Sequence, residues 1–285
     1  MARQGAVPAA LAAPGATLGW PAIDWEQAWL QPLRRPGQRV LQRTAQGLPL
    51  HEALDAEGSA PVRFVPHECL PPGIPYERHI FETGLCPTRA GLHDFFNGLC
   101  WTCLPQAKKQ LNALQAAAIV AAPQGAPRGP LRDAITVFDE NGAWLDAPEL
   151  LWAALRARDW QRLFVDLRPL WRQARLRVFG HALLEKLVTP RKALTAHVWN
   201  APCPLRDPGD PGDLAQADAW LAGEFVAARL SAKPFLPLPV LGIPGWWPEN
   251  QNFSFYDDSV VFRERRGPPP GWTPGEGRNP AAPAS

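Results

Sequence analysis

Apolar residues recur at helical spacing in several separate stretches of the chain. Within residues 24–33, for example, Trp25, Trp29 and Leu33 fall on one helical face. Pro105 suits the first turn of another helix, because a backbone N–H is not needed there. The same spacing predicts helices over 24–33, 88–104, 105–122, 148–158, 159–172, 181–188 and 213–231.

Other stretches alternate between apolar and polar residues, as strands do. The Asn141-Gly142 pair is a strong hairpin signal, so 143–145 is expected to return beside 131–138. Further strands are predicted at 175–179 and 193–199, and 76–80 is expected to be extended. These elements together predict an α+β fold, a single domain with several helices packed on a small, mostly antiparallel sheet.

After Lys233 the chain becomes an arm rich in proline and tryptophan, over 234–262. Trp246 and Trp247 in this arm either stack on a ligand as a lid or close the core as a strap, and the strap is favoured. The expected boundaries are disordered tails at 1–16 and 266–285, a globular domain at 17–265 and a surface loop at 203–212.

Composition limits the classes of function. The formal net charge is +2, so no strong basic field is available for a phosphate backbone, and no nucleic-acid partner is expected. No apolar run approaches the roughly 20 residues that cross a bilayer, which predicts no membrane association. The 5 cysteines are too sparse for a disulfide framework, which favours the cytoplasm. Cys100-x-x-Cys103 has no second pair, so ordinary buried cysteines are favoured over a metal or redox role.

Several uncommon short sequence motifs follow one another along the chain in a characteristic order. They include Tyr76-Glu77-Arg78-His79-Ile80, His93-Asp94-Phe95-Phe96-Asn97, Arg132-Asp133-Ala134, Phe179-Gly180-His181-Ala182-Leu183-Leu184-Glu185 and Gly242-Ile243-Pro244-Gly245-Trp246-Trp247-Pro248. Over about residues 20–263 this order resembles a bacterial family known as domain of unknown function 3025. The resemblance implies no particular activity.

Two predicted helices carry a histidine beside other polar groups. His93 and Asn97 share a helical face four residues apart, with Asp94 one step round. His181 and Glu185 are also four residues apart, a spacing that resembles half of a metal site and is also common in salt bridges. An imidazole oriented by a carboxylate is suited to metal binding or to acid–base work. These groups either satisfy backbone atoms or line a cleft.

Acidic residues gather at two further places. On the predicted strand Asp133 and Asp139 share a face, whereas Glu140 is favoured as a turn residue. Period-two alternation in the extended stretch places Glu77 and His79 on one face. If these segments converge with the two histidine helices, one polar pocket results.

Two hypotheses from different classes follow. The first is a hydrolase-like or metal-dependent enzyme acting on a small polar or phosphorylated substrate. Its expected catalytic residues are His93, Asp94, His181 and Asp133, and its expected ligands for a divalent metal are His93, Asp94, His181 and Glu185. Its expected substrate-binding residues are Asn97, Glu77, His79, Asp139, Trp246 and Trp247. The second is a non-catalytic binding or scaffold protein that meets a protein partner through the tryptophan-rich arm.

Overall fold

The computed structural model of the protein describes residues 19–122, 127–199 and 211–264. Its helices are α1 (Arg34–Ala45), α2 (Leu50–Asp55), α3 (Tyr76–Thr83), α4 (Leu92–Cys103), α5 (Pro105–Ala121), α6 (Pro130–Asn141), α7 (Glu149–Ala157), α8 (His181–Lys186), α9 (Pro211–Glu224) and α10 (Ala227–Ser231). Its strands are β1 (Arg63–Pro66), β2 (Leu85–Thr88), β3 (Gly142–Asp146), β4 (Arg175–Val178), β5 (Thr195–Trp199) and β6 (Phe235–Pro239). The two predicted tails lie outside the described residues, as does the predicted surface loop apart from its last two residues, which begin α9.

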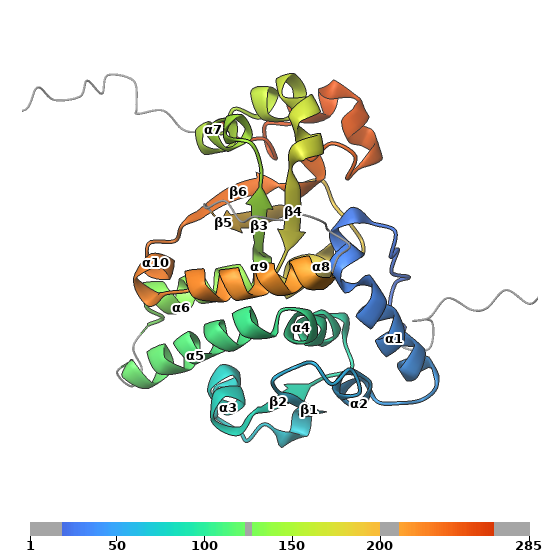
Figure 1. Ribbon diagram of the computed structural model, residues 1–285, viewed down its shortest axis with the longest axis vertical. Coiled ribbons are helices and arrows are strands. Elements are labelled where there is room, and N and C mark those ends of the chain that lie inside the picture. The colour runs from blue at the N-terminus through green and yellow to red at the C-terminus, as the bar shows by residue number, and fades with distance from the viewer. Residues whose placement is uncertain (1–18, 123–126, 200–210, 265–285) are drawn as a thin grey trace, which may run out of the picture.

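The strands form two sheets. The larger has the order β4-β3-β5-β6, in which β3 pairs antiparallel with β4, β5 pairs antiparallel with β6, and β3 and β5 run parallel. The smaller is the parallel pair β1-β2. In Figure 1 the larger sheet lies in the upper half, α4 and α5 cross below it, and the small sheet lies at the bottom with α2 and α3. The α+β prediction, one domain with a small and mostly antiparallel sheet, is confirmed.

The predicted strand over 131–138 is wrong, because this stretch is helix α6. Its apolar residues fit both periods, but Ala134, Ile135 and Phe138 are the ones buried, and they share a helical face. Pro130 occupies the first turn of α6, as helices favour. The predicted hairpin is wrong for the same reason, since the helix ends at Asn141 and β3 begins directly at Gly142.

The extended stretch expected at 76–80 is also helical. Pro75 is the N-cap of α3, and Gly84 ends the helix in the left-handed conformation, with φ of 70°. The helix predicted over 159–172 consists instead of a π-helical turn, Arg162–Asp166, and a 3-10 turn, Arg168–Gln173.

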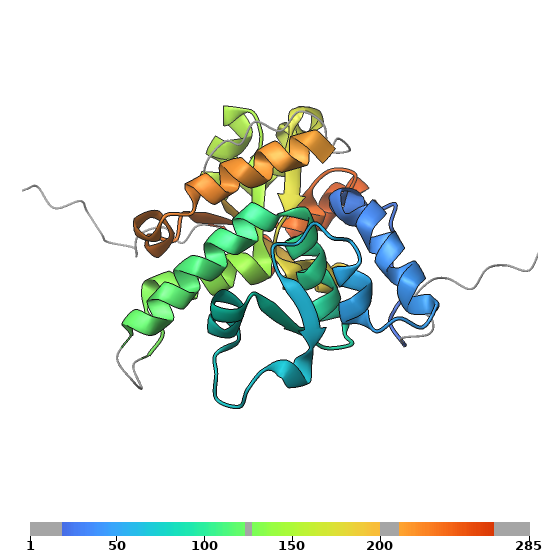
Figure 2. The ribbon, with the colours of Figure 1, turned by 60° about the horizontal axis from the view of Figure 1, so that its bottom comes forward.

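Two further predicted helices differ from the structure. Most of the helix predicted over 24–33 is a 3-10 turn, Ala28–Leu33, which leads into the unforeseen α1. The helix predicted over 213–231 is divided into α9 and α10. In Figure 2 the lower layer turns toward the viewer, with α1 and α2 packed beside α4.

The arm packs against the rest of the molecule. Its first part is β6, and short 3-10 turns follow at Val240–Gly242, Pro248–Gln251 and Phe253–Asp257. The ring of Trp246 lies 5.4 Å from that of Trp29. Trp246 and Trp247 are both partly buried against the larger apolar core. Within the described residues, no helix is long and apolar enough to cross a bilayer.

Candidate functional site

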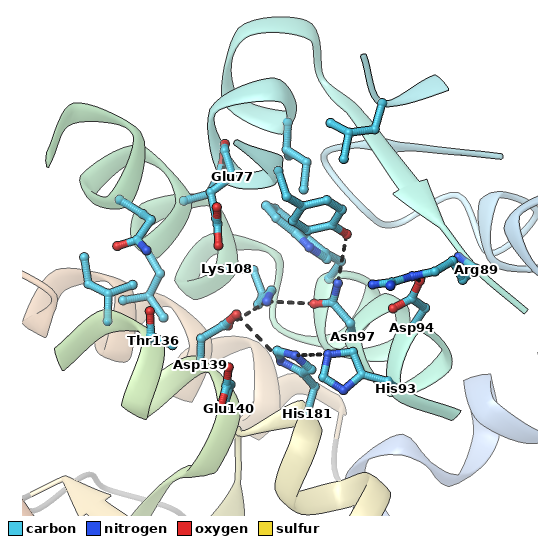
Figure 3. Close-up of a pocket in the computed structure, with 18 of the residues that line it drawn as sticks. Glu77, Arg89, His93, Asp94, Asn97, Lys108, Thr136, Asp139, Glu140 and His181 are labelled. Atoms are coloured by element: carbon cyan, nitrogen blue, oxygen red, sulfur yellow. Dashed lines mark hydrogen bonds and ion pairs between the residues drawn. The ribbon is translucent and has the colours of Figure 1, made fainter. Parts of the chain in front are cut away.

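A cavity of about 320 Å³ opens where α3, α4, α5, α6 and α8 meet (Figure 3). The helices pack on one another around it, α3 on α5, α4 on α8, and α6 on both α5 and α8. Its walls are mainly polar on the side of α4 and α8, where His93, Asn97 and His181 project into it. The convergence of the predicted helix faces is therefore present in the fold.

Two histidines form the centre of this site. The Nε2 atoms of His93 and His181 lie 3.1 Å apart, and the ring planes meet at 79°. The other nitrogen of His93, Nδ1, lies 3.0 Å from Oε2 of Glu185, one turn further along α8. The His93 side chain is 45% exposed and that of His181 only 8%. Both histidines line the cavity, and His93 is the more exposed of the two.

A close contact between α6 and α8 places His181. Gly180 precedes α8, and a Cβ atom there would lie 2.4 Å from the carbonyl oxygen of Glu140. Only glycine allows this approach of two backbones. As a result, Nδ1 of His181 lies 3.6 Å from Oδ2 of Asp139, near the end of α6.

Lys108 from α5 links the histidines to the other side of the site. Its buried Nζ donates to Oδ1 of Asp139 at 2.6 Å and to Oδ1 of Asn97 at 2.9 Å. The ammonium also lies 5.3 Å from the centre of the Trp101 ring. Nδ2 of Asn97 in turn donates to the hydroxyl of Tyr76 at 3.2 Å. A chain of polar contacts therefore runs from Glu185 through both histidines to Tyr76.

Burial determines which groups of this polar network are charged. It lowers the pKa of His181 to about 4, although the Asp139 carboxylate opposes the shift. Burial also opposes ionisation of Asp139, but the nearby positive charges, led by that of Lys108, and the Lys108 hydrogen bond together outweigh it and hold the pKa of Asp139 below its ordinary value. Burial raises the pKa of Tyr76 well above its ordinary value, so the phenol keeps its proton. The buried part of the site is thus a neutral imidazole next to a Lys–Asp ion pair.

Only one proton can lie between the two Nε2 atoms. Two N–H groups pointing at each other would repel, so one imidazole donates and the other accepts. If His93 donates from both nitrogens, to Glu185 and to His181, its positive charge lies beside a carboxylate. If His181 donates instead, His93 presents a neutral ring. The pair can therefore hold or release one proton at the cavity wall without rearranging its heavy atoms.

Asp94 does not join the histidines. Its carboxylate accepts hydrogen bonds from the backbone N–H of Arg89 at 2.6 Å and from the Arg89 Nε–H at 3.3 Å. Within the described part of the chain, no group of three His, Cys, Asp or Glu side chains is arranged to hold a metal ion. The expected metal set of His93, Asp94, His181 and Glu185 is therefore not formed, because Asp94 turns to Arg89 and the two imidazoles point at each other.

Other predicted site residues fall into two groups. Asn97, Glu77 and Asp139 line the cavity, as expected of substrate-binding residues. The described cavity wall does not include Asp133, His79, Trp246 or Trp247.

Helix geometry explains the absence of Asp133 and of His79. Asp133 is six residues from Asp139 on a helix, so the two occupy different faces, and Asp133 pairs with Lys233 at the surface. His79 lies on helix α3 and not on the expected extended stretch, and its side chain is buried in the core.

Lys108, Asn112 and Gln115 also belong to the site, although they were not among the predicted site residues. Together with Leu111 they follow a spacing of three, four and seven residues on α5, and all four line the cavity. A lysine and a glutamine on the apolar face of a helix are costly to bury without a polar site. That signal was present in the sequence.

The cysteine pair takes no part in the site. The Sγ–H of Cys100 donates to the carbonyl oxygen of Phe179 at 3.3 Å, and burial raises the pKa of Cys100 to about 12. Burial likewise raises the pKa of Cys103. Both thiols stay protonated, which agrees with ordinary buried cysteines.

Most of the chain matches a known protein family. The family model described as Protein of unknown function (DUF3025) matches residues 62–266, which bears out the resemblance noted from the sequence. This range contains every helix that lines the cavity. Neither a curated protein nor a solved structure matches the chain.

Proposed function

This chain belongs to the DUF3025 family. Because membership of that family implies no activity, we propose a function from the cavity: the protein is an enzyme that carries out general acid–base chemistry on a small polar molecule. The observation that carries the proposal is the His93–His181 contact of 3.1 Å, in which one ring faces the cavity and the other is buried. Such a pair supplies a proton-transfer group at the cavity wall.

His93 is proposed to transfer the proton. It is the exposed member of the pair, and Glu185 holds its Nδ1 while His181 holds its Nε2. His181 is a positioning residue, because its side chain is only 8% exposed and its Nε2 faces His93. Rotation of His93 away from His181 frees its Nε2 for a substrate or a water molecule.

Hydrolysis by an activated water molecule is the reaction class we favour. Among the described residues, the wall of the cavity contains no serine or cysteine. Its hydroxyl groups are Thr136, which donates to the carbonyl oxygen of Arg132, and Tyr76, which stays protonated. Arg89 at the same cavity is suited to orient a carbonyl or anionic oxygen of the substrate.

The alternative, a scaffold protein that uses the arm to meet a partner, has weaker support. Trp246 packs on Trp29, and both arm tryptophans lie against the apolar core. These contacts favour a structural role for the arm.

The test compares His93→Gln with a matched control, His51→Gln, in which a histidine outside the cavity is changed. Each purified protein is incubated with a mixed metabolite extract, and substrate loss is followed by mass spectrometry. We expect a metabolite that is consumed by the unchanged protein and by His51→Gln, and consumed about 100-fold more slowly by His93→Gln. Equal consumption by all three proteins, or consumption by none, would contradict the proposal.

A further inference from the structure

The end of the cavity away from His93 has a separate set of polar groups. Asn112 and Gln115 come from one face of α5, and Glu77 comes from α3. The two helices are joined there, because Nδ2 of Asn112 donates to the carbonyl oxygen of Glu77 at 2.7 Å. In Figure 3 the Glu77 side chain reaches into the cavity from the side opposite His93.

Gln115 is the most informative of these residues. Its side chain is buried, with 3% of the residue exposed, and it lines the cavity. Its carbonyl oxygen Oε1 has no hydrogen-bond partner among the described residues. Buried acceptors are nearly always paired in folded proteins, so this oxygen is suited to a donor on a ligand.

The charges at this end are acidic. Elsewhere in the cavity each cation has a carboxylate: Lys108 has Asp139, Arg89 has Asp94, and His93 has Glu185. At this end the carboxylate of Glu77 lines the cavity and makes no ion pair within the described residues, whereas Glu140 lies beside His181 (Figure 3). The excess charge at this end is therefore negative.

We propose that the ligand carries a cationic nitrogen, as in a primary amine or a guanidinium group, held by the Glu77 carboxylate and the Gln115 carbonyl oxygen. Such a group supplies N–H donors for Gln115 and a positive charge for Glu77. Its other end then lies toward His93, where the proposed acid–base chemistry occurs. This inference rests on the proposed function for the chemistry, but the binding of the cation can be measured without it.

The test uses ethylamine and methylguanidine as cationic probes, with acetate and inorganic phosphate as anionic probes. Binding to the full chain at millimolar concentrations is followed through the side-chain amide signals of Gln115 in ¹H–¹⁵N NMR spectra. Glu77→Gln and Gln115→Met remove the two proposed contacts. Glu82→Gln is the matched control, because Glu82 lies on the same helix and pairs with Arg78 at the surface.

We expect at least one cationic probe to shift the Gln115 signals saturably and both anionic probes to leave them unchanged. Glu77→Gln should raise the dissociation constant of the cationic probe about tenfold. Gln115→Met, followed through neighbouring signals, should raise it by a similar factor. Glu82→Gln should leave it unchanged. Failure of both cationic probes, preference for an anion, or equal binding by Glu77→Gln would overturn the inference. His93→Gln should bind the probes normally, so loss of its turnover tests the proposed function separately.

Discussion

Lys108 is the residue on which the order of the site depends. A buried ammonium is costly unless a carboxylate and further acceptors surround it, and here Asp139 and Asn97 supply them. The same contacts fix the Asp139 carboxylate, whose second oxygen faces His181. Lys108 therefore acts on the histidine pair without touching it.

His181 makes folding stability depend on pH. Its pKa is about 4 in the folded protein and about 6.5 when unperturbed, so between these values the unfolded chain binds a proton that the folded chain does not. Stability is thus complete above about pH 6.5 and falls as the pH falls toward 4, by up to about 3 kcal/mol. Urea unfolding across this window should show a steeper pH dependence for the unchanged protein than for His181→Gln. The same slope for both proteins would show that His181 is not the group responsible.

At the scale of elements, the contact between α6 and α8 is the feature that assembles the site. A Cβ atom at position 180 would lie 2.4 Å from a backbone oxygen of α6, so Gly180→Ala must push the two helices apart. We expect this change to lower the free energy of unfolding by about 2 kcal/mol and to reduce turnover, since His181 moves away from Asp139. Circular dichroism during urea unfolding measures the first effect, and the metabolite assay measures the second.

Gly223→Ala is the control for that prediction. Gly223 lies in α9, where an added Cβ meets no atom within 4 Å. Because alanine favours the helix, this variant should be more stable by up to about 1 kcal/mol, with turnover unchanged. If Gly180→Ala is as stable and as active as Gly223→Ala, the close contact does not position the site.

Local patterns predicted part of the site. The periodicity over 88–104 and 181–188 gave helices, and these helices place His93, Asn97, His181 and Glu185 on the faces that meet. The stretch 131–138 fits both a helix and a strand, and burial of one helical face decided between them.

The meeting of Asp139 with His181 could not be predicted from local patterns. It depends on the register of α6 against α8, which is a long-range contact made through Gly180. Local sequence reports the period of an element, whereas its partner and register are fixed by tertiary packing.

At the scale of the whole molecule, the arm joins parts of the chain that are distant in sequence. Asn250 is fully buried, and its Nδ2 donates to the carbonyl oxygens of Leu241 and Ile243 at 2.9 and 2.8 Å. Its Oδ1 accepts from Arg168, which also donates to the hydroxyl of Tyr256. The arm is thus held by a buried polar network. In Figure 1 the end of the arm lies above the larger sheet, whereas α4 and α5, which line the cavity, lie below it.

Asn250→Leu separates the role of a strap from that of a lid or partner surface. The change leaves two buried carbonyl oxygens and a guanidinium donor without Asn250, so the free energy of unfolding should fall by about 3 kcal/mol. Gln251→Ala, which removes only an exposed contact to Arg168, should change it by less than about 0.5 kcal/mol. A strap predicts that Asn250→Leu, measured well below its unfolding temperature, still binds the cationic probes and turns over like the unchanged protein. A variant of normal stability that has lost probe binding would instead show that the arm influences the cavity and does more than stabilise the fold.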